Sequence, residues 1–147
     1  MKIKIITILL LTFIIISCGS NKKPISIDIR VNNDRANSLK DAFSTVLLEL
    51  GFDVRENEPK YILEVDVTLS GDIIQDNWFS RIEISANLLE PSTRSLVILP
   101  WNLNTREGHL TADAADARAF RAAASKINEE FKEHISSHMP QIIGKRR

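Results

Sequence analysis

The stretch from Tyr61 to Leu69 alternates apolar and polar residues, and this alternation constrains the fold more than any other feature of the chain. The residues expected on one face are all apolar: Tyr61, Leu63, Val65, Val67 and Leu69. The opposite face carries the polar residues Glu64, Asp66 and Thr68. A period of two residues is typical of a half-buried strand. The chain therefore has to form a sheet with one covered face and one face in water.

Three further strands are predicted from the same kind of pattern. Residues 25–31 and 82–88 alternate in the same way, and a turn at 90–94 precedes a third apolar run at 96–103. Pro100 lies inside that last run and has no N–H to donate, which predicts an edge strand or a bulge there.

Two helices are predicted between and after these strands. Ser38 is the expected N-cap of the first, which has one apolar stripe and ends with Gly51 as its C′ residue. Thr111 is the expected N-cap of the second, and Pro140 is expected to end it. The order β-α-β-β-β-α indicates an α+β fold. We expect a two-layer sandwich in which two helices pack on one face of a four-stranded sheet.

The composition excludes several classes of protein. The chain has 147 residues with 19 basic and 19 acidic side chains, and this balance argues against the nucleic-acid backbone as its partner. A single cysteine excludes an intramolecular disulfide and a zinc site built from cysteines. With 44% hydrophobic residues, the chain is suited to one globular domain, which we expect over residues 25–140.

The N-terminus resembles a bacterial lipoprotein signal. Lys2 and Lys4 precede an apolar run from Ile5 to Ile16 that is too short to span a bilayer as a helix. Ile15-Ile16-Ser17-Cys18 resembles a lipobox, which implies cleavage after residue 17 and lipid attachment to Cys18. The alternative is a plain signal peptide or an N-terminal anchor with an incidental cysteine.

The lipobox resemblance implies that residues 18–24 form a lipidated cysteine and a short tether. The partner at this end would be the membrane, in the cell envelope, with an outer membrane facing the periplasm as the expected location. Lys22 and Lys23, like the basic tail at residues 141–147, are expected to be solvated or to contact anionic headgroups.

No catalytic or cofactor motif is found in the sequence. The five glycines are never adjacent, so no phosphate-binding loop is predicted, and no Gly-x-Ser-x-Gly elbow is present. His134 and His138 are four residues apart and could share a helix face, but two imidazoles alone make a weak metal site. We predict no enzyme, no cofactor and no metal, and interpret these histidines as exposed residues of a last helical turn.

The segment from Gly71 to Ser80 is unusually apolar for a connection between strands. It carries the candidate partner-binding residues Ile73, Ile74, Trp78 and Phe79. Either the hairpin extends and these side chains pack on the core, or an apolar tip is exposed and binds a partner.

Two other positions remain ambiguous. Trp101 has the same two alternatives of core packing and exposure. Residues 106–109 are expected to form a polar loop, either an ordinary connection or a recognition loop.

Taken together, Cys18, the Tyr61–Leu69 alternation and the runs Ala117-Arg118-Ala119 and Ala122-Ala123-Ala124 of the long helix resemble a known group of envelope domains. The chain resembles the small accessory domain of TolB N-terminal regions, CsgG-like lipoproteins and flagella-associated outer-membrane lipoproteins. That resemblance implies a non-catalytic lipoprotein acting in assembly, secretion or structure through an envelope protein partner. The alternative is a lipopolysaccharide-assembly component resembling LptE, or a lipid or glycolipid carrier.

Overall fold

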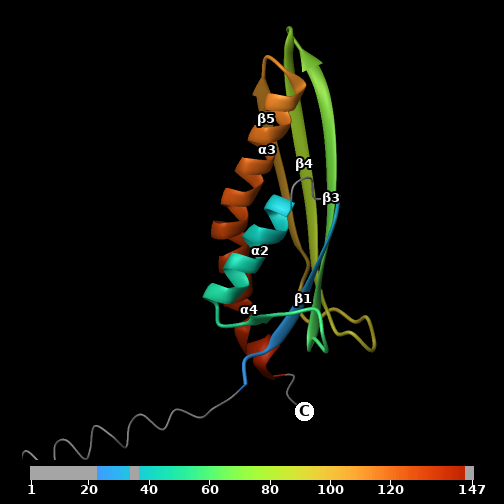
Figure 1. Cartoon of the computed structure of the whole chain (residues 1–147), viewed down its shortest axis with the longest axis vertical. Helices are drawn as coiled ribbons and strands as arrows, with labels where there is room; N and C mark the ends of the chain where they lie inside the picture. The colour runs from blue at the N-terminus through green and yellow to red at the C-terminus, as the bar shows by residue number, and fades with distance from the viewer. Residues whose placement is uncertain (1–22, 34–36, 145–147) are drawn as a thin grey trace, which may run out of the picture.

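A mixed sheet forms one layer of the fold, and helices cover one of its faces (Figure 1). The computed structural model describes residues 23–33 and 37–144. The spatial order of the strands is β2-β1-β3-β4-β5. In chain order they are β1 (Ser26–Asn32), β2 (Asp53–Val54), β3 (Tyr61–Ile74), β4 (Asn77–Leu89) and β5 (Trp101–His109). The helical segments are α2 (Ser38–Glu49), α3 (Ala112–Lys126), the π-turn η2 (Ile127–Phe131) and α4 (Lys132–Gly144).

The predicted α+β two-layer architecture is confirmed, but the predicted strand number is wrong. The sheet has five strands because the short strand β2 adds to the edge of β1 in parallel. Gly51, at φ 83°, ends α2 as predicted, and the N–H of Phe52 returns to the carbonyl of Leu47. The reversed chain then donates from Asp53 N–H to the Ile25 carbonyl. Two residues are too few to show a period in the sequence.

The sheet carries its core on one face. β1 and β3 are parallel, with Ile27 opposite Tyr61, whereas β3, β4 and β5 are mutually antiparallel neighbours. Val65 and Ile82 have 0% exposure, and polar residues such as Asp66 and Glu83 point to the open face. This is the arrangement that the alternation in 61–69 predicts.

The start of β5 differs from the predicted strand at 96–103. The strand begins at Trp101, directly after Pro100, because proline cannot donate to the ladder. Residues 96–100 instead form a loop whose Val97 and Ile98 are buried and whose Val97 N–H bonds the Leu88 carbonyl.

The predicted N-cap of the first helix is off by one residue. Asn37, at φ 57°, holds the cap position of α2, and Ser38 is already helical. Asparagine tolerates this left-handed conformation better than most residues do. Ser38 Oγ is buried and has no partner among the described residues.

The long C-terminal helix contains a π-turn that keeps its buried residues in line. From residue 115 to residue 135 its fully buried residues recur every fourth position: Ala115, Ala119, Ala123, Ile127, Phe131 and Ile135. In a regular α-helix such a row drifts about 40° around the axis at each step. The extra residue in η2 returns the row toward the sheet. The predicted end at Pro140 is wrong, because α4 continues to Gly144 with Pro140 and Ser136 both exposed to water.

Three aromatic rings join the helical layer to the sheet. Phe43 of α2 lies edge-on to Phe131 of η2 at 4.8 Å between ring centroids, and Trp101 of β5 lies 5.4 Å from Phe131. Trp101 is 7% exposed, so the structure places this tryptophan in the core.

Candidate docking tip

The hairpin of β3 and β4 projects beyond the end of the helical layer (Figure 1). The two strands stay paired up to Ile74 and Asn77, so the segment from Gly71 to Ser80 is a continuation of the hairpin. Its two turn residues, Gln75 and Asp76, both have positive φ, at 48° and 63°. Positive φ at both central residues is the requirement of a type I′ hairpin turn.

This hairpin end exposes large apolar side chains. Ile73 is 60% exposed, Ile74 44% and Trp78 37%. Leu110, which follows β5 directly, is 73% exposed, and Trp78 lies opposite His109 in the ladder. We call residues 71–80 together with His109 and Leu110 the distal tip. The hairpin does extend, as the first predicted alternative requires. Its side chains Ile73, Ile74 and Trp78 are nevertheless exposed and not packed on the core, as the second alternative requires.

Leu110 was not among the residues that the sequence singled out. A lone leucine between a strand and a helix cap has no periodic signal. The register of β4 and β5 brings it to the tip, because Trp78 pairs with His109 at the end of the ladder.

Phe79 is oriented differently from its exposed neighbours. It lies opposite both Asp72 and Gly108 in the ladders, and its ring packs over the Gly108 backbone. A β-carbon at position 108 would lie 2.7 Å from the Phe79 ring. The guanidinium of Arg106 covers the ring at 4.7 Å and reaches Asp72 at 3.9 Å. These contacts brace the three strands of the tip against one another.

Two polar contacts fasten the lower end of the tip to the helical layer. The buried hydroxyl of Ser80 donates to Asp116 of α3, and Arg118 of α3 donates to the Gly108 carbonyl at 3.4 Å. Residues 106–109, predicted to be a loop, belong to strand β5. The prediction missed this because Arg106, Glu107 and His109 are polar on both faces of a strand that leaves the core.

His134 and His138, which are interpreted from the sequence as exposed residues and not as a metal site, lie side by side. The rings of His134 and His138 have centroids 4.5 Å apart. However, His134 Nε2 is within 3.0 Å of the Leu99 carbonyl, and His138 Nδ1 is within 2.8 Å of the His134 carbonyl. No group of three or more metal-binding side chains occurs within residues 23–33 and 37–144.

Cys18, the predicted site of lipidation, and residues 145–147 of the predicted basic tail lie outside the described residues. Lys23, the first described residue, is exposed. None of the helices in the described part of the chain is long and apolar enough to cross a membrane.

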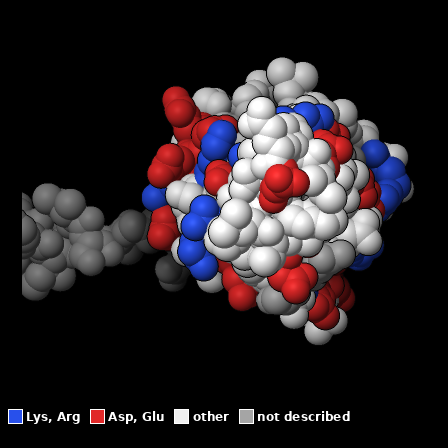
Figure 2. Space-filling model, turned by 90° about the horizontal axis from the view of Figure 1, so that it is seen from above, with Lys and Arg blue, Asp and Glu red and all other residues white. Residues whose placement is uncertain are grey.

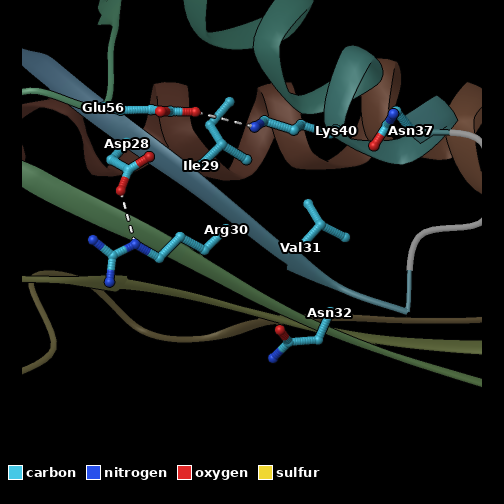
Figure 3. A pocket seen from close by; sticks show the side chains of 8 residues that line it. All are labelled: Asp28, Ile29, Arg30, Val31, Asn32, Asn37, Lys40 and Glu56. Atoms are coloured by element: carbon cyan, nitrogen blue, oxygen red, sulfur yellow. Dashed lines mark hydrogen bonds and ion pairs between the residues drawn. The ribbon is translucent and has the colours of Figure 1, made fainter.

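Two hollows on the described surface are lined mostly by polar or charged residues. One, of about 480 Å³, follows β1 beyond the end of β2 (Figure 3). Its charges are paired with one another: Arg30 Nε bonds Asp28 at 2.8 Å, and Lys40 lies 3.7 Å from Glu56. The other, also about 480 Å³, lies on the open face of the sheet. The first hollow lies at the edge between β1 and α2, where Lys40 and Glu56 line it, and the second lies on the face of the sheet away from the helices. Charged and polar linings of this kind do not suit acyl chains.

Comparisons with known proteins define the fold more closely than the function. No protein-family model matches the chain, and no curated protein matches its sequence. A minor lipoprotein from Acinetobacter baumannii has a similar structure, with a TM-score of 0.61 and 11% identity, over 78% of this chain and 92% of that one.

Two further structures have the same fold at similar distance. A Caulobacter crescentus protein described as a lipoprotein matches with a TM-score of 0.53 and 15% identity, over 82% of this chain and 93% of that one. A Xanthomonas campestris protein of family DUF330 matches with a TM-score of 0.54 and 17% identity, over 79% and 85%. At these identities the likeness establishes a shared fold, one that bacterial lipoproteins adopt.

Proposed function

We propose that this chain is a non-catalytic lipoprotein of the cell envelope, anchored through Cys18, that binds a protein partner with its distal tip. The lipobox-like sequence at 15–18 and the fold shared with lipoproteins support the anchor. The resemblance to envelope accessory domains supports a role in assembly, secretion or structure, in the outer membrane facing the periplasm.

The observation that carries the docking role is the position of the exposed apolar residues relative to the tether. β1 begins beside Tyr61 at the start of β3, and the tip is thirteen residues further along β3. At about 3.3 Å per residue this separates the tether from the tip by roughly 40 Å. The six residues from Gly19 to Pro24 reach at most about 20 Å. An upright domain therefore presents the tip away from the membrane that holds Cys18.

Exposed apolar residues in one place are characteristic of protein contacts. Large apolar groups such as Ile73 and Trp78 cost free energy when they remain in water, and tryptophan is enriched at the energetic centres of interfaces. The brace around Phe79 adds to this, because a rigid tip loses little conformational entropy on binding.

The test is truncation of Trp78 in the full lipoprotein. Trp78→Ala should abolish co-purification of the partner from membranes while changing the free energy of unfolding by less than about 1 kcal/mol. Leu99→Ala is the matched control, because Leu99 is 70% exposed but lies outside the tip. If Trp78→Ala costs about 3 kcal/mol or more, the side chain belongs to the core and the docking role is wrong.

A further inference from the structure

The distal tip and the first turns of α3 carry more acidic than basic side chains. Within residues 70–81 and 105–118 there are five acidic residues and three arginines. The acidic residues are Asp72, Asp76, Glu107, Asp113 and Asp116. Seen from above, the tip end is centred on uncharged side chains, with an acidic group among them and both acidic and basic groups around them (Figure 2).

The three arginines are held in contacts within the domain. Arg106 lies on the Phe79 ring and near Asp72, and Arg118 donates to the Gly108 carbonyl. Arg81 lies 3.9 Å from Glu83 on the open face of the sheet.

Several of the acidic groups, in contrast, have no internal counter-charge. Asp76 at the turn and Asp113 in the first turn of α3 are exposed, and Glu107 is half-buried. Among the described residues, none of these three carboxylates has a hydrogen bond or an ion pair. They remain available to a cationic partner.

The apolar residues of the tip lie on both faces of the hairpin. Ile73 and Trp78 are a directly opposed pair, and the alternation of β3 and β4 places them on the helix side. Ile74 and Phe79 are on the open side by the same alternation. A hairpin end that is apolar on both faces has the shape of a wedge, which buries most surface when it enters a groove with two walls.

We propose that the partner of the tip is a protein with an apolar groove whose rim carries lysine or arginine side chains. This inference rests on the proposed docking function and specifies its partner. The apolar wedge supplies the buried centre, and Asp76, Glu107 and Asp113 supply a rim of opposite charge to the groove. The same carboxylates disfavour the alternative, a second membrane surface, because anionic headgroups repel them.

The test is photocrosslinking from position 110 in isolated membranes that hold the full lipoprotein. Leu110 is replaced by benzoylphenylalanine, and crosslinking is measured at 50 and 500 mM salt. We expect a protein adduct whose crosslinked peptide is apolar and flanked by lysine or arginine. Its yield should fall at high salt and should fall about fivefold in the Asp76→Asn/Asp113→Asn variant.

The control variant is Glu58→Gln/Glu129→Gln, which removes two exposed charges outside the tip. It should leave the adduct unchanged. If the yield of the protein adduct changes neither with salt nor in the Asp76→Asn/Asp113→Asn variant, the partner's groove has no basic rim. The proposed docking function would still stand. Adducts to lipid alone, or no adduct, would overturn the docking function as well.

Discussion

Gly108 is the residue on which the brace of the tip depends. Its missing side chain leaves room for the Phe79 ring, and a β-carbon there would come within 2.7 Å of the ring. We predict that Gly108→Ala displaces the ring and lowers the free energy of unfolding by about 1 kcal/mol, measured by chemical denaturation. In the Phe79→Ala background the same change should have little effect on the free energy of unfolding. The double-mutant cycle should therefore show an interaction energy between positions 79 and 108.

Gly71→Ala is the matched control for this cycle. The nearest atom to a β-carbon at 71 is the Phe79 carbonyl oxygen at 3.7 Å, an ordinary contact. This variant should unfold at the same denaturant concentration as the unmodified chain or a slightly higher one. Equal destabilisation by alanine at 71 and at 108 would contradict the brace.

The two tryptophans should respond in opposite ways to truncation. Trp101 is 7% exposed and packs against Phe43 and Phe131, so Trp101→Ala should cost about 3–5 kcal/mol. Trp78 is 37% exposed at the tip, and Trp78→Ala should cost less than about 1 kcal/mol. Urea titrations of both variants make the comparison. Similar losses at the two positions would show that the tip belongs to the core.

At the residue scale, the sequence indicates the apolar residues of the tip but not the contacts that each of them makes. Ile73, Ile74 and Trp78 stand out because apolar side chains are unusual between two strands. The brace role of Phe79 was not predictable, because it depends on Gly108 and Arg106 of another strand. For the same reason the burial of Trp101 could not be decided before the positions of Phe43 and Phe131 were known.

The π-turn at the centre of the long helix should make the effect of a one-residue deletion depend on where the residue is removed. Because η2 holds one residue more per turn, removing Asn128 should convert it to an α-turn and keep Phe131 facing the sheet. Removing Ala122 from α3 should instead rotate all later residues by about 100° and take Phe131 and Ile135 out of the core. Thermal unfolding followed by circular dichroism compares the two.

The deletion of Asn128 should retain a cooperative transition, and the deletion of Ala122 should lose it. If both deletions are equally damaging, the π-turn does not keep the buried row in register.

At the element scale, periodicity predicted the long elements and failed at the short and polar ones. Strand β3 and the two predicted helices have clear periods. Strand β2 has two residues, and the turn at Gln75-Asp76 lacks the glycine or asparagine that usually indicates a type I′ hairpin. The sequence therefore leaves open whether the hairpin extends through residues 71–80, and the ladder of β3 and β4 shows that it does.

At the scale of the whole molecule, the proposed membrane anchoring requires a lipid on Cys18. Cys18→Ala should abolish incorporation of radiolabelled palmitate and leave the uncleaved precursor, as gel mobility and mass spectrometry can show. The domain contains no other cysteine, so any remaining label could not be attached to a thiol. A variant that is still processed and labelled would show that residues 1–17 are not a lipoprotein signal.

The elongated shape gives the proposed anchor and the tip separate roles. Strand β1 begins at the end of the domain away from the tip, and the C-terminal helix ends at that same lower end (Figure 1). In the proposed orientation the domain would hold the tip roughly 40 Å from the membrane. Stability resides in the aromatic and aliphatic core, while recognition is assigned to residues that the core does not need.

The central claim is that the tip of the membrane-anchored protein contacts another protein. In-cell photocrosslinking from position 78, followed by mass spectrometry of the attached species, tests this most directly. Position 99, exposed outside the tip, is the control. We expect one protein adduct from position 78 that position 99 does not form. Adducts to lipid at position 78, or the same protein adducts from both positions, would contradict it.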